Sequence, residues 1–182
     1  MSGWPLMRRI TRLVVLSICI HSCLLSQLSA AESAARGWLA WRGPQQNGTS
    51  AETGLPDQVD SSAPLWTMDF AGRGTPVING NKVYVLGYEG AGPDLQQVLR
   101  CIEADSGKMI WEQRFNDFLS DTVYDRYSIG SPVIDRETGN VYVLTTAGEF
   151  VGFTGDGEPL WGHSMMEDYG RLTFPNGRMV LR

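Results

Sequence analysis

A repeated unit of roughly 50 residues constrains the fold of this chain more than any other sequence feature. Residues 74–79, Gly-Thr-Pro-Val-Ile-Asn, recur 56 positions later as Gly-Ser-Pro-Val-Ile-Asp at 130–135. The segment Val-Tyr-Val-Leu at 83–86 recurs 58 positions later at 141–144. Successive units end on a tryptophan, and these are Trp66, Trp111 and Trp161. Such a period predicts stacked copies of one supersecondary unit, of the length found in propeller blades.

Within each unit, short runs of alternating or β-branched residues predict four strands separated by tight turns. The predicted strands of the first unit cover residues 75–78, 82–86, 97–103 and 109–115. Those of the second unit cover residues 131–135, 140–146, 148–154 and 159–164. The turns are rich in Asn, Asp and Gly, which accept the backbone angles of tight turns. The segment from Gly87 to Gln96 has no counterpart of equal length and is predicted to be a loop insertion.

The sequence therefore predicts an all-β fold, a partial β-propeller of four-stranded antiparallel blades. Two complete blades are expected at about 74–115 and 130–164, together with an orphan strand near 64–70. A ring of seven or eight blades requires roughly 350–400 residues, so it is not closed within these 182 residues. We expect a truncated N-terminal fragment of a longer protein. The alternatives are an open arc of blades and a ring that closes by oligomerisation.

The N-terminal segment has the three-part layout of a secretory signal. Basic residues up to Arg12 precede a mostly apolar run at 13–25, and Ser29 and Ala31 stand before a predicted cleavage site at Glu32. The predicted organisation is a signal peptide of the Sec type at 1–31, a lead-in segment at 32–63 and the partial propeller at 64–182. An uncleaved membrane anchor is the alternative, but the apolar run is short and interrupted by polar residues. We therefore expect an exported protein, periplasmic or secreted, without a membrane span after cleavage.

Removal of the signal leaves an acidic chain with little reactive chemistry. The first 31 residues contain three of the 15 basic side chains and none of the 20 acidic ones, so 12 against 20 remain. This balance excludes the basic surface that nucleic-acid binding requires. Cys101 and His163 are the only cysteine and histidine left, which excludes an intrachain disulfide and a multi-histidine metal site. Cys101 is predicted to be a buried strand residue and not a reactive thiol.

The repeat resembles that of the pyrroloquinoline-quinone (PQQ)-like β-propeller superfamily, which includes quinoprotein alcohol dehydrogenases and the assembly factor BamB. The resemblance lies in Gly-Ser/Thr-Pro-Val-Ile, in Val-Tyr-Val, and in Ala-Asp-Ser-Gly-Lys-Met-Ile-Trp at 104–111. The opening Trp-Leu-Ala-Trp-Arg-Gly-Pro at 38–44 is similar to the start of secreted bacterial members. In this family an Ala/Gly/Trp motif docks its tryptophan between blades. The resemblance implies structural roles for five residues, Ala104, Gly107, Trp111, Gly157 and Trp161.

The resemblance implies two alternative functions. The first is an exported, non-enzymatic binding or scaffolding module with protein partners in the cell envelope. The second is the N-terminal fragment of a PQQ-dependent quinoprotein oxidoreductase. No catalytic, cofactor-binding or metal-binding residue is assigned. PQQ with calcium is expected only in a closed full-length propeller, because the cofactor lies on the axis where the blades converge.

One loop of the predicted propeller is a candidate for binding. The acidic, aromatic loop between the two units is either a binding loop or an ordinary packed connection, and its candidate residues are Asp121, Tyr124, Asp125, Arg126 and Tyr127. Trp111 and Trp161 are expected to be buried at equivalent places in successive sheets. Two blades that do not close a ring expose strand edges and an apolar face, so self-association is also predicted.

Overall fold

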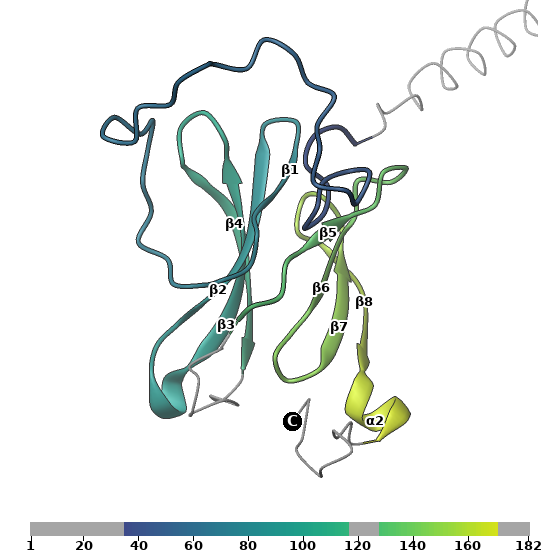
Figure 1. Ribbon diagram of the computed structural model, residues 1–182. Coiled ribbons are helices and arrows are strands. Elements are labelled where there is room, and N and C mark those ends of the chain that lie inside the picture. Colours follow the sequence, from purple (N-terminus) through teal and green to yellow (C-terminus); the bar gives the residue numbers. More distant parts are fainter. Residues whose placement is uncertain (1–34, 117–127, 171–182) are drawn as a thin grey trace, which may run out of the picture. The chain divides into compact units, whose positions relative to one another are not determined.

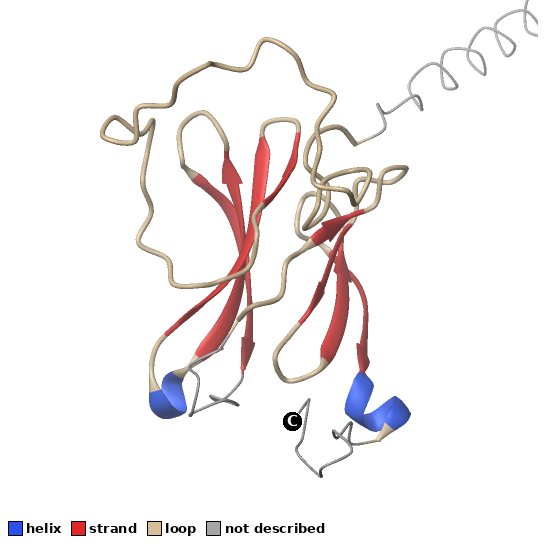
Figure 2. Cartoon of the chain, in the orientation of Figure 1, coloured by secondary structure: helices blue, strands red, loops and turns tan. Residues whose placement is uncertain are grey.

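The structure, a computed structural model, describes residues 35–116 and 128–170. These residues form two four-stranded antiparallel sheets, each with its strands in sequence order (Figure 1). Sheet 1 contains β1 (Val77–Asn79), β2 (Lys82–Glu89), β3 (Gln96–Glu103) and β4 (Met109–Asn116). Sheet 2 contains β5 (Val133–Ile134), β6 (Val141–Leu144), β7 (Glu149–Phe153) and β8 (Pro159–Ser164). Two short helices, the 3₁₀ helix η1 (Gly92–Asp94) and α2 (Met165–Tyr169), complete the described secondary structure (Figure 2).

The predicted all-β fold with four strands in each unit is confirmed, with one difference in strand length. The expected loop insertion from Gly87 to Gln96 is shorter than predicted, because β2 continues to Glu89 and pairs with the start of β3 at Gln96, which leaves residues 90–95 as the connection. Gly87 is needed here for close packing and not for a turn. A Cβ at Gly87 would lie 2.5 Å from the ring of Phe70, so only glycine lets that ring approach.

The prediction of an orphan strand near 64–70 is wrong. This segment has no ladder, and the nearest regular backbone pairing is an isolated bridge between Ala71, just after it, and Tyr88 of β2. Side chains hold the segment instead: Trp66 packs on Gly107, and the Arg100 guanidinium lies 4.2 Å from the centre of the Phe70 ring.

The core lies between the two sheets and follows from the two-residue alternation of each strand. Sheet 1 contributes Val77, Tyr84, Leu86, Leu99 and Cys101, and sheet 2 contributes Ile134, Val141, Val143 and Phe153. We call these two facing surfaces the inner faces. All nine side chains are buried, and full burial of a large apolar side chain stabilises a fold by about 1.5–3 kcal/mol.

The lead-in segment connects the first strands of the two sheets. The amide of Ile78 in β1 donates to the carbonyl of Trp38 at 2.8 Å, and the amide of Ile134 in β5 donates to Leu39 at the same distance. The side chain of Leu39 also belongs to the core between the sheets. Two consecutive residues of the lead-in therefore bond one strand from each sheet.

A buried glutamine provides a polar connection between the sheets. Gln97 of β3 donates from Nε2 to Ser128 Oγ at 3.0 Å and accepts the amide of Thr146, just after β6, at 2.8 Å. Gln97 and Ser128 are both buried. Because buried polar groups are stable only when hydrogen-bonded, this amide fixes the spacing of the sheets at one point.

Replacement of this glutamine should destabilise the fold. We expect Gln97→Leu to lower the free energy of unfolding by about 1–3 kcal/mol, since the amide of Thr146 would be left buried without its acceptor. Urea denaturation followed by circular dichroism measures the change. The matched control is Gln96→Leu at the neighbouring half-buried position, whose hydrogen bond to Asn116 is open to solvent, and we expect a smaller loss of about 0.5 kcal/mol there. Equal losses in the two variants would contradict a role for the buried amide.

Candidate functional site

The most distinctive local geometry is an indole ring seated on a glycine turn. Trp111 of β4 lies over Gly157, in the turn between β7 and β8, and its Nε1 donates to the carbonyl of Gly155 at 3.2 Å. Gly157 has φ = 89°, and a Cβ there would lie 2.7 Å from the indole. Both facts require glycine, because other residues rarely adopt this φ and would collide with the ring. The contact therefore fixes sheet 1 on sheet 2.

The same contact occurs once more, at the turn between β3 and β4. Trp66 lies over Gly107, whose φ is 71° and whose added Cβ would lie 2.6 Å from the indole. The Nε1 of Trp66 donates to the carbonyl of Ala104 at 2.7 Å. The structure thus places Ala104 and Gly107 beneath an indole from the preceding unit. Gly155 takes the place of Ala104 in the second copy, where the turn is one residue shorter.

The expectation that Trp111 and Trp161 are both buried is not met, because Trp111 is half-buried, as Trp66 is, and Trp161 is exposed. It lies on the face of sheet 2 that points away from sheet 1 and is 39% exposed. Its described neighbours belong to its own sheet: the Tyr142 ring stacks at 5.5 Å between centroids and the Phe150 ring meets it edge-on at 5.1 Å. No sheet covers this face in the described part of the chain.

This outer face of sheet 2 is defined by Val133, Tyr142, Leu144, Phe150 and Trp161. These residues occupy the strand positions that Val77, Tyr84, Leu86, Leu99 and Trp111 occupy on the inner face of sheet 1. The apolar character is the same, but the environment is opposite. Leu86 is 1% exposed and Leu144 is 45% exposed. Its contiguous exposed apolar side chains make the outer face of sheet 2 a candidate contact surface.

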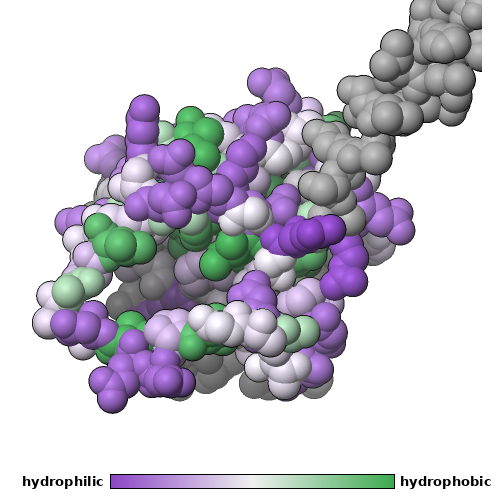
Figure 3. Space-filling model, turned by 90° about the horizontal axis from the view of Figure 1, so that it is seen from above, coloured by the Kyte–Doolittle hydropathy of each residue, from purple (hydrophilic) through white to green (hydrophobic). Residues whose placement is uncertain are grey.

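The space-filling view shows how apolar and polar side chains are distributed on another side of the molecule. Apolar residues interrupt a largely hydrophilic surface in several places (Figure 3). Isolated apolar side chains of this kind are normal on protein surfaces and need no partner. The outer face of sheet 2 is different because its apolar residues are neighbours in one sheet.

Charged groups of sheet 1 form a network on the face opposite to its inner face. Arg114 contacts Glu89 at 2.8 Å and Glu112 at 2.7 Å, and Arg100 contacts the same two carboxylates. Hydrogen bonds from Arg114 and then Arg100 hold the pKa of Glu89 below its usual value. Glu89 therefore stays ionised, and both carboxylates are paired with arginines, as in a structural network and not an acid–base site.

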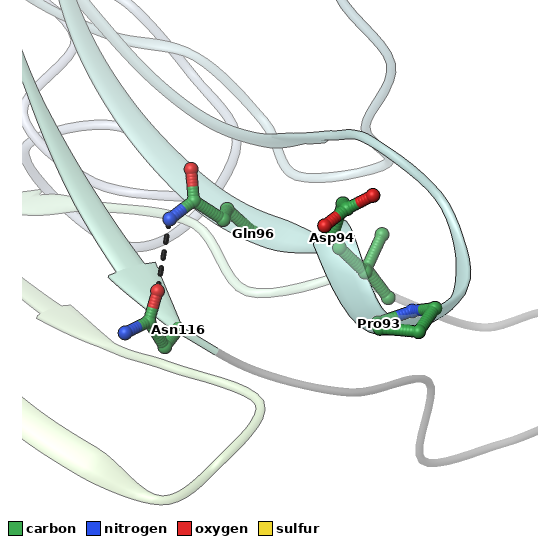
Figure 4. Close-up of a pocket in the computed structure, with 5 residues that line it drawn as sticks. Pro93, Asp94, Gln96 and Asn116 are labelled. Atoms are coloured by element: carbon green, nitrogen blue, oxygen red, sulfur yellow. Dashed lines mark hydrogen bonds between the residues drawn. The ribbon is translucent and has the colours of Figure 1, made fainter.

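One shallow cavity lies beside η1, where Gln96 donates from Nε2 to Asn116 Oδ1 at 2.8 Å (Figure 4). Its lining residues are Pro93, Asp94, Leu95, Gln96 and Asn116. Asp94 is the one ionisable group among them. The lining therefore offers no second group with which Asp94 could act as an acid–base pair.

The described residues do not fit a PQQ–calcium site. Calcium in such a site needs several carboxylate or amide oxygens that converge on one point. Within residues 35–116 and 128–170, no three His, Cys, Asp or Glu side chains are grouped closely enough to hold a metal. His163 and Asp168 approach to 3.4 Å, but Ser164 beside them caps α2 by accepting the amide of Glu167.

Several predicted features lie outside the described residues. They include the signal peptide at 1–31 and the candidate binding loop with Asp121, Tyr124, Asp125, Arg126 and Tyr127. The feature that sequence reasoning missed is the outer face of sheet 2. Its signal was present, because the repeat itself places Tyr142, Leu144 and Trp161 at the positions of Tyr84, Leu86 and Trp111.

Cys101 is fully enclosed in the core, next to Tyr84. Burial raises the pKa of its thiol to about 11. The Tyr84 hydroxyl donates to the carbonyl of Gly155 at 3.2 Å, and burial raises the pKa of this phenol also. Because the thiolate is the reactive form, Cys101 is inert in the folded protein near neutral pH.

Alkylation should report this burial. We expect Cys101 to resist iodoacetamide at pH 8 in the native protein and to react fully in urea, as measured by mass mapping of the peptide that contains it. The raised pKa also predicts a pH effect. The contribution of the Cys101 thiol to the free energy of unfolding is fully present below the pKa of the unfolded thiol, near 9. It is lost as pH rises through about 11, because the thiol of the unfolded state releases its proton at a lower pH than that of the folded state. Rapid native labelling at pH 8 would contradict the placement in the core.

The two tryptophans should differ in their contribution to stability. We expect Trp111→Ala to lower the free energy of unfolding by about 3–5 kcal/mol, because it removes a ring packed between the sheets. Trp161→Ala should cost about 1 kcal/mol or less, since its face is open. Guanidinium denaturation of both variants measures the difference. Equal losses in the two variants would contradict this prediction, because they would mean that the two rings have equivalent environments.

Two four-stranded sheets locked by a tryptophan on a glycine turn define a repeat protein of the β-propeller class. A family model described as outer membrane protein assembly factor BamB, built on the PQQ-type repeat, matches residues 57–178, and the chain belongs to this family. The chain is therefore a partial PQQ-repeat propeller, as the sequence predicted. No match is found among curated proteins.

A solved structure is also similar, the quinohemoprotein alcohol dehydrogenase from Comamonas testosteroni. The identity is 18% and the TM-score is 0.37. The match covers 57% of this chain and 14% of the dehydrogenase chain, so the present chain corresponds to a small part of that enzyme. Within the described residues, neither helix has the length and apolar composition needed to cross a membrane.

Proposed function

We propose that the chain is an exported, non-enzymatic binding or scaffolding protein that contacts protein partners in the cell envelope through the outer face of sheet 2. The observation that carries this proposal is the repetition of the inner face of sheet 1. Leu86 is buried against a neighbouring sheet, whereas Leu144, at the equivalent position, is 45% exposed. A surface built like a sheet-packing interface but open to solvent suits the binding of another protein.

Charge and targeting support the same proposal. The chain is acidic, with 20 acidic and 15 basic side chains, and the outer face is apolar and aromatic, which suits a protein partner better than a polyanion. The basic and apolar N-terminal segment supports export. The matching family model carries the name of an outer-membrane assembly factor, which supports a partner in the envelope.

The partners of the described ionisable groups support a non-enzymatic role. Glu89 and Glu112 are held by two arginines. Asp156 is paired with Lys82 at 2.7 Å, and this lysine holds the pKa of the carboxyl below its usual value. Each group stabilises the sheets or the contact between them. The pKa shifts of Glu89 and Asp156 are both downward, away from the range near neutral pH in which a carboxyl group acts as a general acid or base.

Photo-crosslinking in cells tests the proposal. A benzoylphenylalanine placed at Leu144, on the outer face, should form covalent adducts with protein when the full chain is expressed and exported. The matched control is the same residue at Glu137, an exposed turn position away from this face. We expect adducts from the first position and few from the second, as measured by immunoblotting of the irradiated envelope fraction.

Two results would contradict the proposal. The first is the absence of adducts from Leu144, or equal adducts from both positions. The second is the appearance of quinone absorbance when the purified protein is incubated with PQQ and Ca²⁺. This second result would support the alternative of an oxidoreductase fragment.

A further inference from the structure

Each contact between successive units has a donor and a receptor. The donor is a tryptophan in the last strand of a unit, and the receptor is a glycine turn in the next. Gly157 receives Trp111, and Gly107 receives Trp66. Trp161 is a third donor, and no described turn receives it.

The receptor on sheet 1 accepts an indole in the required geometry, although no sheet stands behind that indole. Trp66 lies in residues 64–73, which we call the strap. The strap has no strand, and its one regular backbone pairing is the bridge between Ala71 and Tyr88. Leu65, beside the tryptophan, is 90% exposed. Among residues 35–116 and 128–170, no complete sheet therefore lies at the place where Trp66 is held.

The strap covers sheet 1 less completely than sheet 1 covers sheet 2. Ile78 of sheet 1 and Ile134 of sheet 2 occupy equivalent positions in the repeat. Ile78 is 38% exposed, whereas Ile134, packed under sheet 1, is 4% exposed. Val83 and Val85 are likewise less buried than their counterparts Val141 and Val143. We call this face the outer face of sheet 1. It is incompletely covered over β1 and β2, whereas Val98 and Ile102 of β3 are buried on it, and it also bears the charged network of sheet 1.

Both halves of an interface are thus present at opposite faces of one chain. We infer that a second copy of this chain docks head to tail, with the outer face of sheet 2 of one copy against the outer face of sheet 1 of the next. Trp161 then takes the place of Trp66 on Gly107. This inference rests on the proposed function, because it names the partner of the same surface.

The preorganised donor has an advantage over the strap. Trp161 belongs to β8, which is paired along its length with β7, and its ring is fixed by Tyr142 and Phe150. It enters the receptor with an aromatic face already assembled, whereas Trp66 brings only the strap. Each copy offers one donor that no described turn receives, Trp161, and one receptor that only the strap fills, Gly107, so the contact between copies is heterologous and extends to a ring or an open chain of copies.

Sedimentation velocity of the purified full chain over a range of concentrations tests the inference. The wild type should associate, and Trp161→Ala should weaken association about tenfold or more, because a buried interfacial tryptophan is lost. Trp66→Ala empties the receptor and should strengthen association. The matched control is Trp41→Ala, which removes an indole that is 65% exposed in the lead-in, and it should change association less than about twofold.

The double variant Trp66→Ala, Trp161→Ala distinguishes specific docking from non-specific association. Docking predicts that it stays monomeric, since the receptor is empty but the donor is missing. Association of the double variant equal to that of Trp66→Ala would overturn the inference. Association of the wild type that Trp66→Ala leaves unchanged would also overturn it, because two outer faces of sheet 2 would then be paired with each other.

If Trp66→Ala fails to fold, the inference is tested by mapping crosslinks in a chain that keeps Trp66. Copies with benzoylphenylalanine at Leu144 are mixed with ¹⁵N-labelled copies that lack it. Light-to-heavy crosslinks should fall in sheet 1, and crosslinks in sheet 2, or none, would overturn the inference. Adducts with other proteins but none between copies would leave the proposed function standing. The absence of every adduct from Leu144 would contradict both the inference and the proposed function.

Discussion

The contact between an indole and a glycine turn is the interaction on which the rest of this structure depends. It joins a strand of one sheet to a turn of the next and leaves the two inner faces at a distance that apolar side chains fill. A tryptophan is large enough to span this gap, and its Nε1 has a fixed acceptor in the turn. Gly157 is required beneath it, since any side chain would occupy the space of the ring.

In this repeat, identical residues at equivalent positions differ in how deeply they are buried. Tyr84 and Tyr142 occupy the same position in successive units, and each contacts the tryptophan of its own sheet. Tyr84 is fully buried, while Tyr142 is partly exposed. Their local sequences are nearly identical, so the difference comes from the neighbouring sheet alone.

The sequence predicts the eight strands because β-strand alternation and turn residues are local signals. It does not predict the length of β2, since Gly87 has the same appearance in a turn and under a packed ring. It wrongly predicts a strand at 64–70, because strand formation requires a partner that local sequence cannot show. The docking role of Gly107 follows from the family motif, but the exposure of Trp161 depends on what lies beyond it. The fold was therefore more predictable than the contact surface.

The lead-in segment has a consequence for the order in which the chain folds. The hydrogen bond from Ile134 to Leu39 joins residues about 95 positions apart, and the bond from Ile78 to Trp38 joins residues about 40 apart. Closing such loops costs chain entropy before the contact is made, so these bonds form slowly. A chain is synthesised from its N-terminus. The first segment to be made is therefore among the last to reach its native contacts, because those contacts require both sheets.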